Sequence, residues 1–292
     1  MNTAFVLAGG GSLAAVQVGM MQALSERGIH PDLLVGTSAG ALNAAYVAGH
    51  GTGMDALRDL VELWHSLRRR TVFPLSPVRS VLAAVGAQDS LCSSAPLANL
   101  LVPHLPYRLL ERAETPVHVV ATDVLTGQGV LLSEGNAVSA LLASCAIPGI
   151  YPSVRRDGRL LCDGALADES AVFQAADLGA DRIYILTAGT ACALDRPPRH
   201  PVAAALHAIT LLLQQRANLE TRALAGTVDL RVIPGLCPLT VSAADFGHAR
   251  ELVSRAHAAS AEWLDAGMDP VPAPERFLSL HGHNPRVTRS AS

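Results

Sequence analysis

The chain has 292 residues, of which 50% are hydrophobic, 16% are charged and 4% are aromatic, and its 22 basic and 25 acidic side chains give a net charge of −3. This composition excludes a disordered chain, a collagen-like repeat and a disulfide-dense mini-protein, and the length suits one large domain. The slightly acidic balance and the few aromatic residues argue against a nucleic-acid partner.

The first fifty residues predict two strands joined by a helix. Residues 4–7 form a short apolar run that a glycine cluster ends, and apolar residues then recur at helical spacing from Ser12 to Gly28. A second apolar run covers residues 33–35, and residues 39–48 favour a second helix. Because two strands separated by one helix form a right-handed crossover, a parallel sheet is expected.

Strands and helices continue to alternate along the rest of the chain. The expected strands cover residues 117–121, 129–132, 159–162, 182–187 and 230–233, and the expected helices cover 54–70, 95–101, 137–144, 201–226 and 244–266. The alternation predicts an α/β fold with helices on both faces of a mainly parallel sheet. Residues 1–270 are expected to form one domain, and residues 271–292, rich in proline, arginine and serine, a flexible tail.

The cysteines and the apolar segments indicate the cellular compartment in which the protein is expected. The five cysteines contain no CxxC pair, which favours reduced thiols over a disulfide framework or a metal site. The N-terminus has no basic region of the signal-peptide kind, and the longest apolar stretch, residues 201–213, is too short to span a membrane. A cytoplasmic protein is therefore expected.

The strongest local motif is Gly36-Thr37-Ser38-Ala39-Gly40, which stands between the second strand and the second helix. A GxSxG sequence in that position is typical of a nucleophile elbow, where small residues permit a turn tight enough to raise the serine above the sheet edge. The positive end of the following helix favours negative charge at the serine oxygen. The alternative is an ordinary turn with a helix-capping serine.

Gly9-Gly10-Gly11-Ser12 follows the first strand, at the same edge of the predicted sheet. Consecutive glycines expose backbone N–H groups that can converge on an oxyanion. Gly9, Gly11 and Ala14 also fit the G-x-G-x-x-A fingerprint of dinucleotide-binding proteins. That fingerprint needs an acidic residue at the end of the second strand, and the only nearby one, Asp32, stands at its beginning.

The best candidate for a base is Asp163, which follows the strand over residues 159–162 and precedes Gly164 and Ala165. A carboxylate next to Ser38 can accept the hydroxyl proton without an intervening imidazole. An ordinary Asp-Gly turn is the alternative. A Ser-Asp-His triad would instead need a histidine from the late part of the chain, where the candidates are His200, His207, His248 and His257.

Five segments in this order resemble the patatin-like phospholipases. They are GGGSLAAVQVGM, GTSAGALNAA, ATDVLTGQ, LLASCAIPGIYPSV and LCDGALADES, all within residues 1–190, with a helical remainder over 195–270. The resemblance implies a three-layer α/β/α sandwich of the patatin type. It also implies hydrolysis of acyl esters of phospholipids, lysophospholipids or other lipids, without a metal or another cofactor.

The same resemblance implies a role for each motif residue. Ser38 would be the nucleophile and Asp163 its base, within the Asp163-Gly164-Ala165 motif. Gly36 and Gly40 would shape the elbow, and Gly9, Gly10, Gly11 and Ser12 would stabilise the oxyanion. Members of the family usually carry a basic residue and a glycine where this chain has Leu13 and Ala14. That departure leaves open a catalytically weak protein with a binding or regulatory role, and a thioesterase or another serine hydrolase is the second alternative.

Two segments could bring such an enzyme to lipid. Arg68-Arg69-Arg70 stands beside the apolar residues 72–75, an arrangement compatible with contact to an anionic bilayer and equally with a solvated helix end. Residues 78–85 could form a lid, a lipid-facing helix or a core helix. Peripheral membrane contact therefore stands as an expectation beside the lipid or acyl-ester substrate, and no oligomeric state is predicted.

Overall fold

The computed structural model describes residues 1–74, 76–167, 171–190, 192–194, 197, 201–267 and 274–280. Through this part of the chain runs an eight-stranded sheet in the order β5-β6-β3-β2-β1-β7-β8, with β4 paired to β3. The strands are β1 (Thr3–Leu7), β2 (Leu33–Thr37), β3 (Val117–Asp123), β4 (Gly129–Leu132), β5 (Val154–Arg156), β6 (Arg159–Asp163), β7 (Arg182–Leu186) and β8 (Asp229–Ile233).

The sheet has a parallel centre and an antiparallel end. Strands β1, β2, β3, β7 and β8 run parallel to their neighbours among themselves. Strands β4 and β6 run antiparallel to β3, and β5 runs antiparallel to β6. The predicted class, an α/β fold with a central sheet between helical layers, is confirmed, whereas the direction of β6 differs from the parallel run that the alternation of elements favours.

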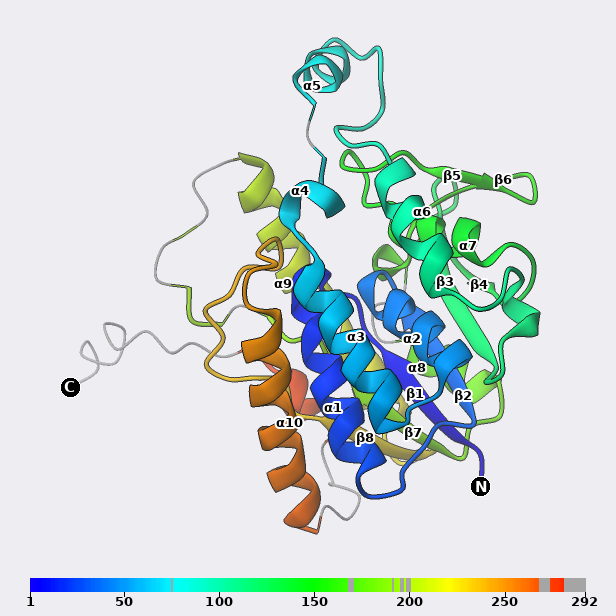
Figure 1. Ribbon diagram of the computed structural model, residues 1–292, viewed down its shortest axis with the longest axis vertical. Coiled ribbons are helices and arrows are strands. Elements are labelled where there is room, and N and C mark those ends of the chain that lie inside the picture. The colour runs from blue at the N-terminus through cyan, green and yellow to red at the C-terminus, as the bar shows by residue number, and fades with distance from the viewer. Residues whose placement is uncertain are drawn as a thin grey trace, which may run out of the picture.

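Helices cover both faces of the sheet. The α-helices are α1 (Ala15–Ser25), α2 (Ala39–His50), α3 (Met54–Ser66), α4 (Arg69–Val72), α5 (Pro77–Ala84), α6 (Ala95–Leu101), α7 (Ala137–Ser144), α8 (Val172–Asp177), α9 (Pro201–Leu224) and α10 (Ala249–Asp265). Short 3₁₀ helices include η1 (Gly11–Ala14), η4 (Gly164–Leu166) and η5 (Pro274–Leu278). In Figure 1, α1, α2, α3 and α10 lie in front of the strands, and α5 stands clear of the body at the top of the view.

Two apolar cores lie on opposite sides of the sheet because successive side chains of a strand point to opposite faces. Along β1, Phe5 and Leu7 belong to the core shared with α1, α2 and α10. Ala4 and Val6, which alternate with them, belong to the core shared with α8 and α9. The sheet is therefore buried on both faces, as the continuous apolar runs of its central strands predict.

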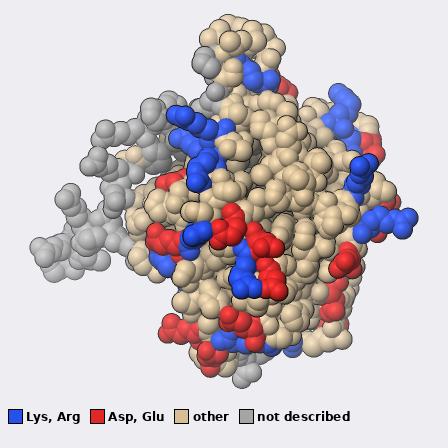
Figure 2. Space-filling model, viewed as in Figure 1, with Lys and Arg blue, Asp and Glu red and all other residues tan. Residues whose placement is uncertain are grey.

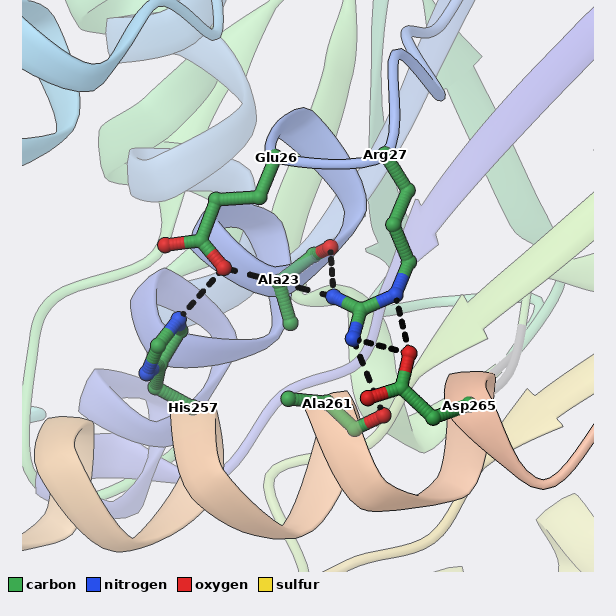
Figure 3. A network of polar contacts seen from close by, with 6 residues as sticks. All are labelled: Ala23, Glu26, Arg27, His257, Ala261 and Asp265. Atoms are coloured by element: carbon green, nitrogen blue, oxygen red, sulfur yellow. Dashed lines mark hydrogen bonds and ion pairs between the residues drawn. The ribbon is translucent and has the colours of Figure 1, made fainter.

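Helices α1 and α10 pack closely, and a polar network fastens their ends (Figure 3). A side chain at Gly19 would place its Cβ 2.2 Å from the carbonyl oxygen of Val253, so only glycine permits this approach. Arg27 donates to Asp265 (2.5 Å) and to the Ala261 carbonyl (3.1 Å), and His257 bonds Glu26 at 2.9 Å. The contact at Gly19 and this network at residues 23–27 together hold α1 against α10.

One predicted helix is divided in the structure. The expected helix over residues 54–70 ends at Ser66, where Leu67 and Arg68 adopt extended backbone, and α4 begins at Arg69. The Arg68 guanidinium donates to the carbonyl oxygens of His65 (2.5 Å) and Leu67 (2.9 Å), which satisfies carbonyls that the helix end leaves without partners. The run of arginines therefore ends the helix instead of continuing it.

Part of the predicted flexible tail is folded, so the prediction of a flexible tail over residues 271–292 is wrong for η5. Pro274 and Leu278 are buried, and Leu278 joins the core beside α9. Gln214 donates to the Leu278 carbonyl at 2.8 Å. The apolar side chains within the polar tail explain this docking, whereas residues 271–273 and 281–292 lie outside the described residues.

Across the described helices, none combines the length and apolar character needed to cross a bilayer. Within the same residues, no group of three or more histidine, cysteine or acidic side chains is arranged to hold a metal ion.

Candidate active site

Ser38 occupies the turn between β2 and α2 in a strained backbone conformation. Its φ of 52° and ψ of −126° lie outside the regions that ordinary L-residues prefer. The Ser38 amide donates to the Ser144 Oγ atom at 2.8 Å, which holds the turn from α7. This conformation places the serine side chain at the sheet edge, as a nucleophile elbow requires.

Gly40 allows the elbow to pack against the neighbouring strand. A Cβ atom at position 40 would lie 2.1 Å from the Leu7 carbonyl oxygen and 2.5 Å from that of Ala8. Gly36, at the other end of the motif, would place a Cβ 2.5 Å from the Ala41 Cα atom. Close backbone contacts on both sides of Ser38 thus leave no room for a Cβ atom at either glycine of the GxSxG sequence.

The sheet register brings Asp163 level with Ser38. Thr37 pairs with Val120 on one side of β3, and Asp163 pairs with Ala121 on the other side. Ser38 and Asp163 consequently stand at the same height, separated by the width of β3. Their side chains close this gap of about 10 Å between the backbones of β2 and β6.

A direct hydrogen bond joins the two side chains. The Ser38 Oγ atom donates to the Asp163 Oδ2 atom at 2.7 Å, and both residues are buried. The other carboxylate oxygen, Oδ1, accepts the Ala165 amide at 3.0 Å within η4. The Asp163 backbone is held as well, because Thr122 Oγ1 donates to its carbonyl at 2.7 Å and its amide donates to the Ala146 carbonyl at 3.0 Å.

Burial changes the proton affinity of this carboxyl group. Removal from water raises the pKa of Asp163 from 3.8 to about 6, although the hydrogen bonds from Ser38 and from the Ala165 amide act in the opposite direction. A carboxylate with a pKa near 6 is a stronger base than an exposed one and is still mostly ionised at neutral pH. Both properties suit a proton acceptor for the Ser38 hydroxyl.

The glycine loop lies beside the elbow, with Gly10 and Gly11 at positive φ. Gly11 and Ser38 line the same cavity. The Ser12 amide donates to the Ala243 carbonyl at 2.8 Å, and its hydroxyl donates to the Ser242 carbonyl at 3.1 Å, so Ser12 fastens the loop to residues 242–243. Among the described residues, none accepts a hydrogen bond from the amides of Gly10 or Gly11.

The Leu13 and Ala14 side chains face the core. Both are buried, with 1% and 0% of their surface exposed, and both belong to the cluster beneath the loop. The apolar residue at position 13 therefore packs the start of α1 instead of facing the cavity.

An apolar cavity of about 840 Å³, the space open to solvent at its mouth included, extends from Ser38. Its wall is built mainly by α2, α3, α4 and α6 and carries leucines and aromatic residues; it includes Leu42, Tyr46, Leu60, Leu63, Trp64, Leu67, Val72, Phe73, Leu97, Leu100, Leu101, Leu105, Tyr151 and Phe246. Ser38 is therefore one of the residues that line an apolar cavity, and Asp163 contacts Ser38 without being part of that lining.

A buried polar chain supports the site behind the glycine loop, and the sequence analysis did not find it. Trp64 Nε1 donates to Asn43 Oδ1 (2.8 Å), and Asn43 Nδ2 donates to Gln17 Oε1 (2.9 Å). Gln17 Nε2 donates in turn to the Ala8 carbonyl at 2.7 Å. Polar residues within otherwise small or apolar helical segments, as Asn43 and Gln17 are, were the available signal.

None of the described alternative residues, His207 of α9 included, lines the cavity that Ser38 lines. His257 bonds Glu26 at 2.9 Å and His248 lies 3.3 Å from the Asp245 carboxylate, whereas His200 lies outside the described residues. Asp32 accepts the Thr3 amide at 2.7 Å at the start of β2, which is not the place where a dinucleotide ribose would bind.

A comparison with protein families places the chain. The model of the patatin-like phospholipase family matches residues 5–176, a segment that holds the elbow, the glycine loop and Asp163. The chain belongs to the patatin-like phospholipase family. The match ends near the C-terminus of α8, so the later helices α9 and α10 lie outside it.

Curated relatives agree with this assignment. An uncharacterized NTE family protein of Mycobacterium bovis is 30% identical over 181 residues, which are 62% of this chain and 47% of the relative. Patatin-like phospholipase domain-containing protein 7 of the mouse is 26% identical over 193 residues, 64% of this chain and 14% of its own length. The chain therefore spans about half the length of the first of these relatives and a small part of the second.

Solved structures with a similar arrangement include two bacterial proteins. VipD from Legionella pneumophila aligns with a TM-score of 0.46 and 14% identity over 95% of this chain and 66% of its own. ExoU of the type III secretion system of Pseudomonas aeruginosa, in its complex with SpcU, aligns with a TM-score of 0.39 and 18% identity over 91% and 52% of the two chains.

Proposed function

We propose that this protein is a lipid acyl hydrolase in which Ser38 is the nucleophile and Asp163 its general base. The observation that carries the proposal is the 2.7 Å hydrogen bond from the Ser38 hydroxyl to the Asp163 carboxylate, beside an apolar cavity. Membership of the patatin-like phospholipase family supports the substrate class.

The proposed reaction proceeds in two acyl-transfer steps. Ser38 Oγ attacks the ester carbonyl while its proton passes to Asp163 Oδ2, and the tetrahedral intermediate then expels the alcohol, which takes that proton. Water next attacks the acyl-enzyme with Asp163 again as base, and the fatty acid leaves as Ser38 regains its proton. No histidine is needed in this cycle, because the carboxylate contacts the hydroxyl directly.

Stabilisation of the oxyanion is assigned to the glycine loop that contains Gly9, Gly10 and Gly11. The amides of Gly10 and Gly11 are the best candidates, because Gly11 lines the cavity with Ser38 and the Ser12 amide already donates to Ala243. Ser12 would then position the loop. Preorganised amides of this kind contribute on the order of 10²- to 10³-fold to the rate for each donor.

The apolar lining of the cavity suggests that the enzyme recognises a long acyl group of its substrate. Its wall is mostly leucine and aromatic side chains, and Ser38 is one of the few polar residues that line it. An acyl chain could bury its methylene groups there, each contributing about 0.8 kcal/mol, while the ester carbonyl reaches the dyad.

Hydrolysis of three substrates tests the proposal: a p-nitrophenyl ester, the matching acyl thioester and a phospholipid with the same acyl chain. We expect release from the oxygen esters, a preference for long over short chains, and a loss of at least roughly a thousandfold in Ser38→Ala. Ser66→Ala, which changes an exposed serine at the end of α3, is the matched control and should retain full turnover. Unchanged turnover in Ser38→Ala would refute the assignment, and release from the thioester alone would favour a thioesterase.

A further inference from the structure

An exposed arm projects from the rim of the cavity between two anchored ends. At its first end Val72 and Phe73 line the cavity, the Tyr151 hydroxyl donates to the Val72 carbonyl, and the Phe73 ring lies 6.0 Å from that of Phe246. At its second end the amides of Leu91 and Cys92 donate to the carbonyls of residues 149 and 150, at 3.0 and 2.8 Å. We define the arm as the described residues of 68–90, with α4 at its first end and α5 at its tip.

Helix α5 carries apolar side chains into solvent. Val78, Val81 and the residue that ends the helix, Val85, are 68%, 65% and 72% exposed. Their spacing of three and four residues places them on one side of the helix. Single exposed apolar residues are ordinary, but three on one side of a projecting helix form a surface that an apolar environment would stabilise.

The arm is positively charged although the whole chain is negative. Between Leu67 and Ser90 the sequence carries four arginines and one carboxylate, Asp89, a net charge of 4 − 1 = +3 against −3 for the chain. Arg69 and Arg70 are exposed on α4, whereas Arg79 donates to Ser90 at 3.1 Å. Figure 2 shows a largely uncharged knob over α5 and, below it, a group of basic side chains, all of them arginines in this chain.

We infer that this arm docks on an anionic lipid surface, with the valines of α5 entering the headgroup region and Arg69 and Arg70 contacting the lipid phosphates. Basic side chains beside an apolar helical side are the combination that binds anionic membranes. The consequence for catalysis rests on the proposed function: because the arm begins at the rim, docking would turn the mouth of the cavity towards the bilayer that holds the acyl chains.

A lipid surface fits this patch better than a protein partner. Protein interfaces are enriched in tyrosine, tryptophan, phenylalanine and methionine at their centre, whereas the large exposed apolar side chains described on α5 are valines. The excess of positive charge selects an anionic surface. A second copy of the chain would bring the same net charge of +3 against the arm.

Sedimentation with vesicles tests the inference, using full-length protein with Ser38→Ala so that no lipid is consumed. The vesicles contain either phosphatidylcholine alone or phosphatidylcholine with phosphatidylglycerol. We expect binding to the anionic vesicles at 0.1 M salt and its loss at 0.5 M, because salt screens the attraction of the arginines. Arg69→Gln with Arg70→Gln should weaken binding roughly 30-fold, and Val78→Ser with Val81→Ser and Val85→Ser at least roughly tenfold.

Matched controls change equally exposed residues elsewhere. Val124→Ser with Leu125→Ser alters the turn between β3 and β4, where the two side chains are 43% and 85% exposed, and Arg108→Gln with Arg112→Gln removes two exposed arginines. Both controls should bind vesicles like the parent protein. Equal binding by the arm variants and the controls, or equal binding to neutral and anionic vesicles, would overturn the inference. A dimer that the valine substitutions dissociate would overturn it in favour of a protein interface.

Hydrolysis of a soluble short-chain ester separates this inference from the proposed function. With Ser38 intact, the arm variants should hydrolyse that ester at the parental rate and lose activity only on anionic vesicles. If the protein binds vesicles through the arm but hydrolyses neither substrate, the proposed function is wrong and the inference that the arm docks on lipid still holds.

Discussion

Two parts of the cavity lining are built in opposite ways: the part at Ser38, here called the closed end, and the part at Val72 and Phe73, where the arm starts, here called the mouth. At the closed end Ser38 and Asp163 are buried, joined by a 2.7 Å hydrogen bond and surrounded by glycines that backbone contacts demand. At the mouth the arm carries exposed valines and arginines, and hydrogen bonds at residues 72, 91 and 92 anchor its two ends. At the closed end, packing and a hydrogen bond fix the positions of two side chains. At the mouth, the exposed side chains of the arm determine which surface it can contact.

The largest expected effect falls on the carboxylate at the closed end. Asp163→Asn removes the proposed proton acceptor while nearly keeping the size of the side chain, and we expect turnover to fall at least roughly a thousandfold. Asp177→Asn, at the exposed end of α8, is the matched control. Steady-state kinetics on a soluble ester measure the difference, and comparable turnover in both variants would mean that the base lies elsewhere.

The packing of the elbow predicts a severe loss of stability in Gly40→Ala. The new methyl group would lie 2.1 Å from the Leu7 carbonyl oxygen, so β1 or α2 must move, and we expect the free energy of unfolding to fall by about 3 kcal/mol or more. Gly53→Ala meets no atom within 4 Å at an ordinary φ of −63° and should change stability by less than about 1 kcal/mol. Denaturant unfolding of the two variants provides the test, and similar midpoints would contradict the close packing.

Asp163 should lower the stability of the folded protein at neutral pH. Its pKa is raised from 3.8 to about 6 in the fold, so the folded state binds the proton more tightly, and stability falls as pH rises through this interval. Asp163→Asn, which cannot ionise, should be more stable than the parent by up to about 3 kcal/mol at pH 8. This advantage should disappear near pH 4, and thermal unfolding at both pH values measures it.

The raised pKa of Asp163 also predicts how kcat/KM changes with pH on the acid side of the profile. The base is active only when ionised, so kcat/KM for a soluble ester should rise about tenfold per pH unit below 6 and level off above it. An ester whose own groups do not titrate in this range isolates the effect. A profile that is flat between pH 4.5 and 7 would contradict the assignment of Asp163 as the base.

The smallest effect is expected at the mouth. Because Val78, Val81 and Val85 are 65% or more exposed, replacing all three with serine should change the free energy of unfolding by no more than about 1 kcal/mol. A large destabilisation would show that α5 is packed as a core helix, and the contrast between the two ends would fail. Thermal unfolding decides between these outcomes.

The sequence predicts the closed end better than the mouth. Ser38 and Asp163 lie in short sequence motifs that contain glycines. These glycines occupy positions where the backbone of a neighbouring segment lies too close for a Cβ atom. The sequence does not predict that β6 runs antiparallel to β3, because only the pairing of Ala121 with Asp163 reveals it. Nor does it predict which atom holds the elbow, because the hydrogen bond from the Ser38 amide to the Ser144 Oγ atom depends on tertiary packing.

At the mouth, composition leaves several structures open. The arginine run is compatible with a continuing helix or with a helix end. In the structure α3 ends before it, and Arg68 donates hydrogen bonds to carbonyls at that end. Residues 78–85 fit a core helix or an exposed one equally well by spacing, and burial alone separates the two. The docked η5 is likewise decided by tertiary contacts, since the sequence alone does not show that Leu278 packs against the core beside α9.

Covalent labelling with a fluorophosphonate probe tests the central claim most directly, because the probe reacts with activated serine hydroxyls and needs no knowledge of the natural lipid. Mass spectrometry of the labelled and digested protein should find a single adduct on the peptide that contains Ser38, and Asp163→Asn should label much more slowly. A folded protein that takes up no probe, or that carries the adduct on another serine, would contradict the account.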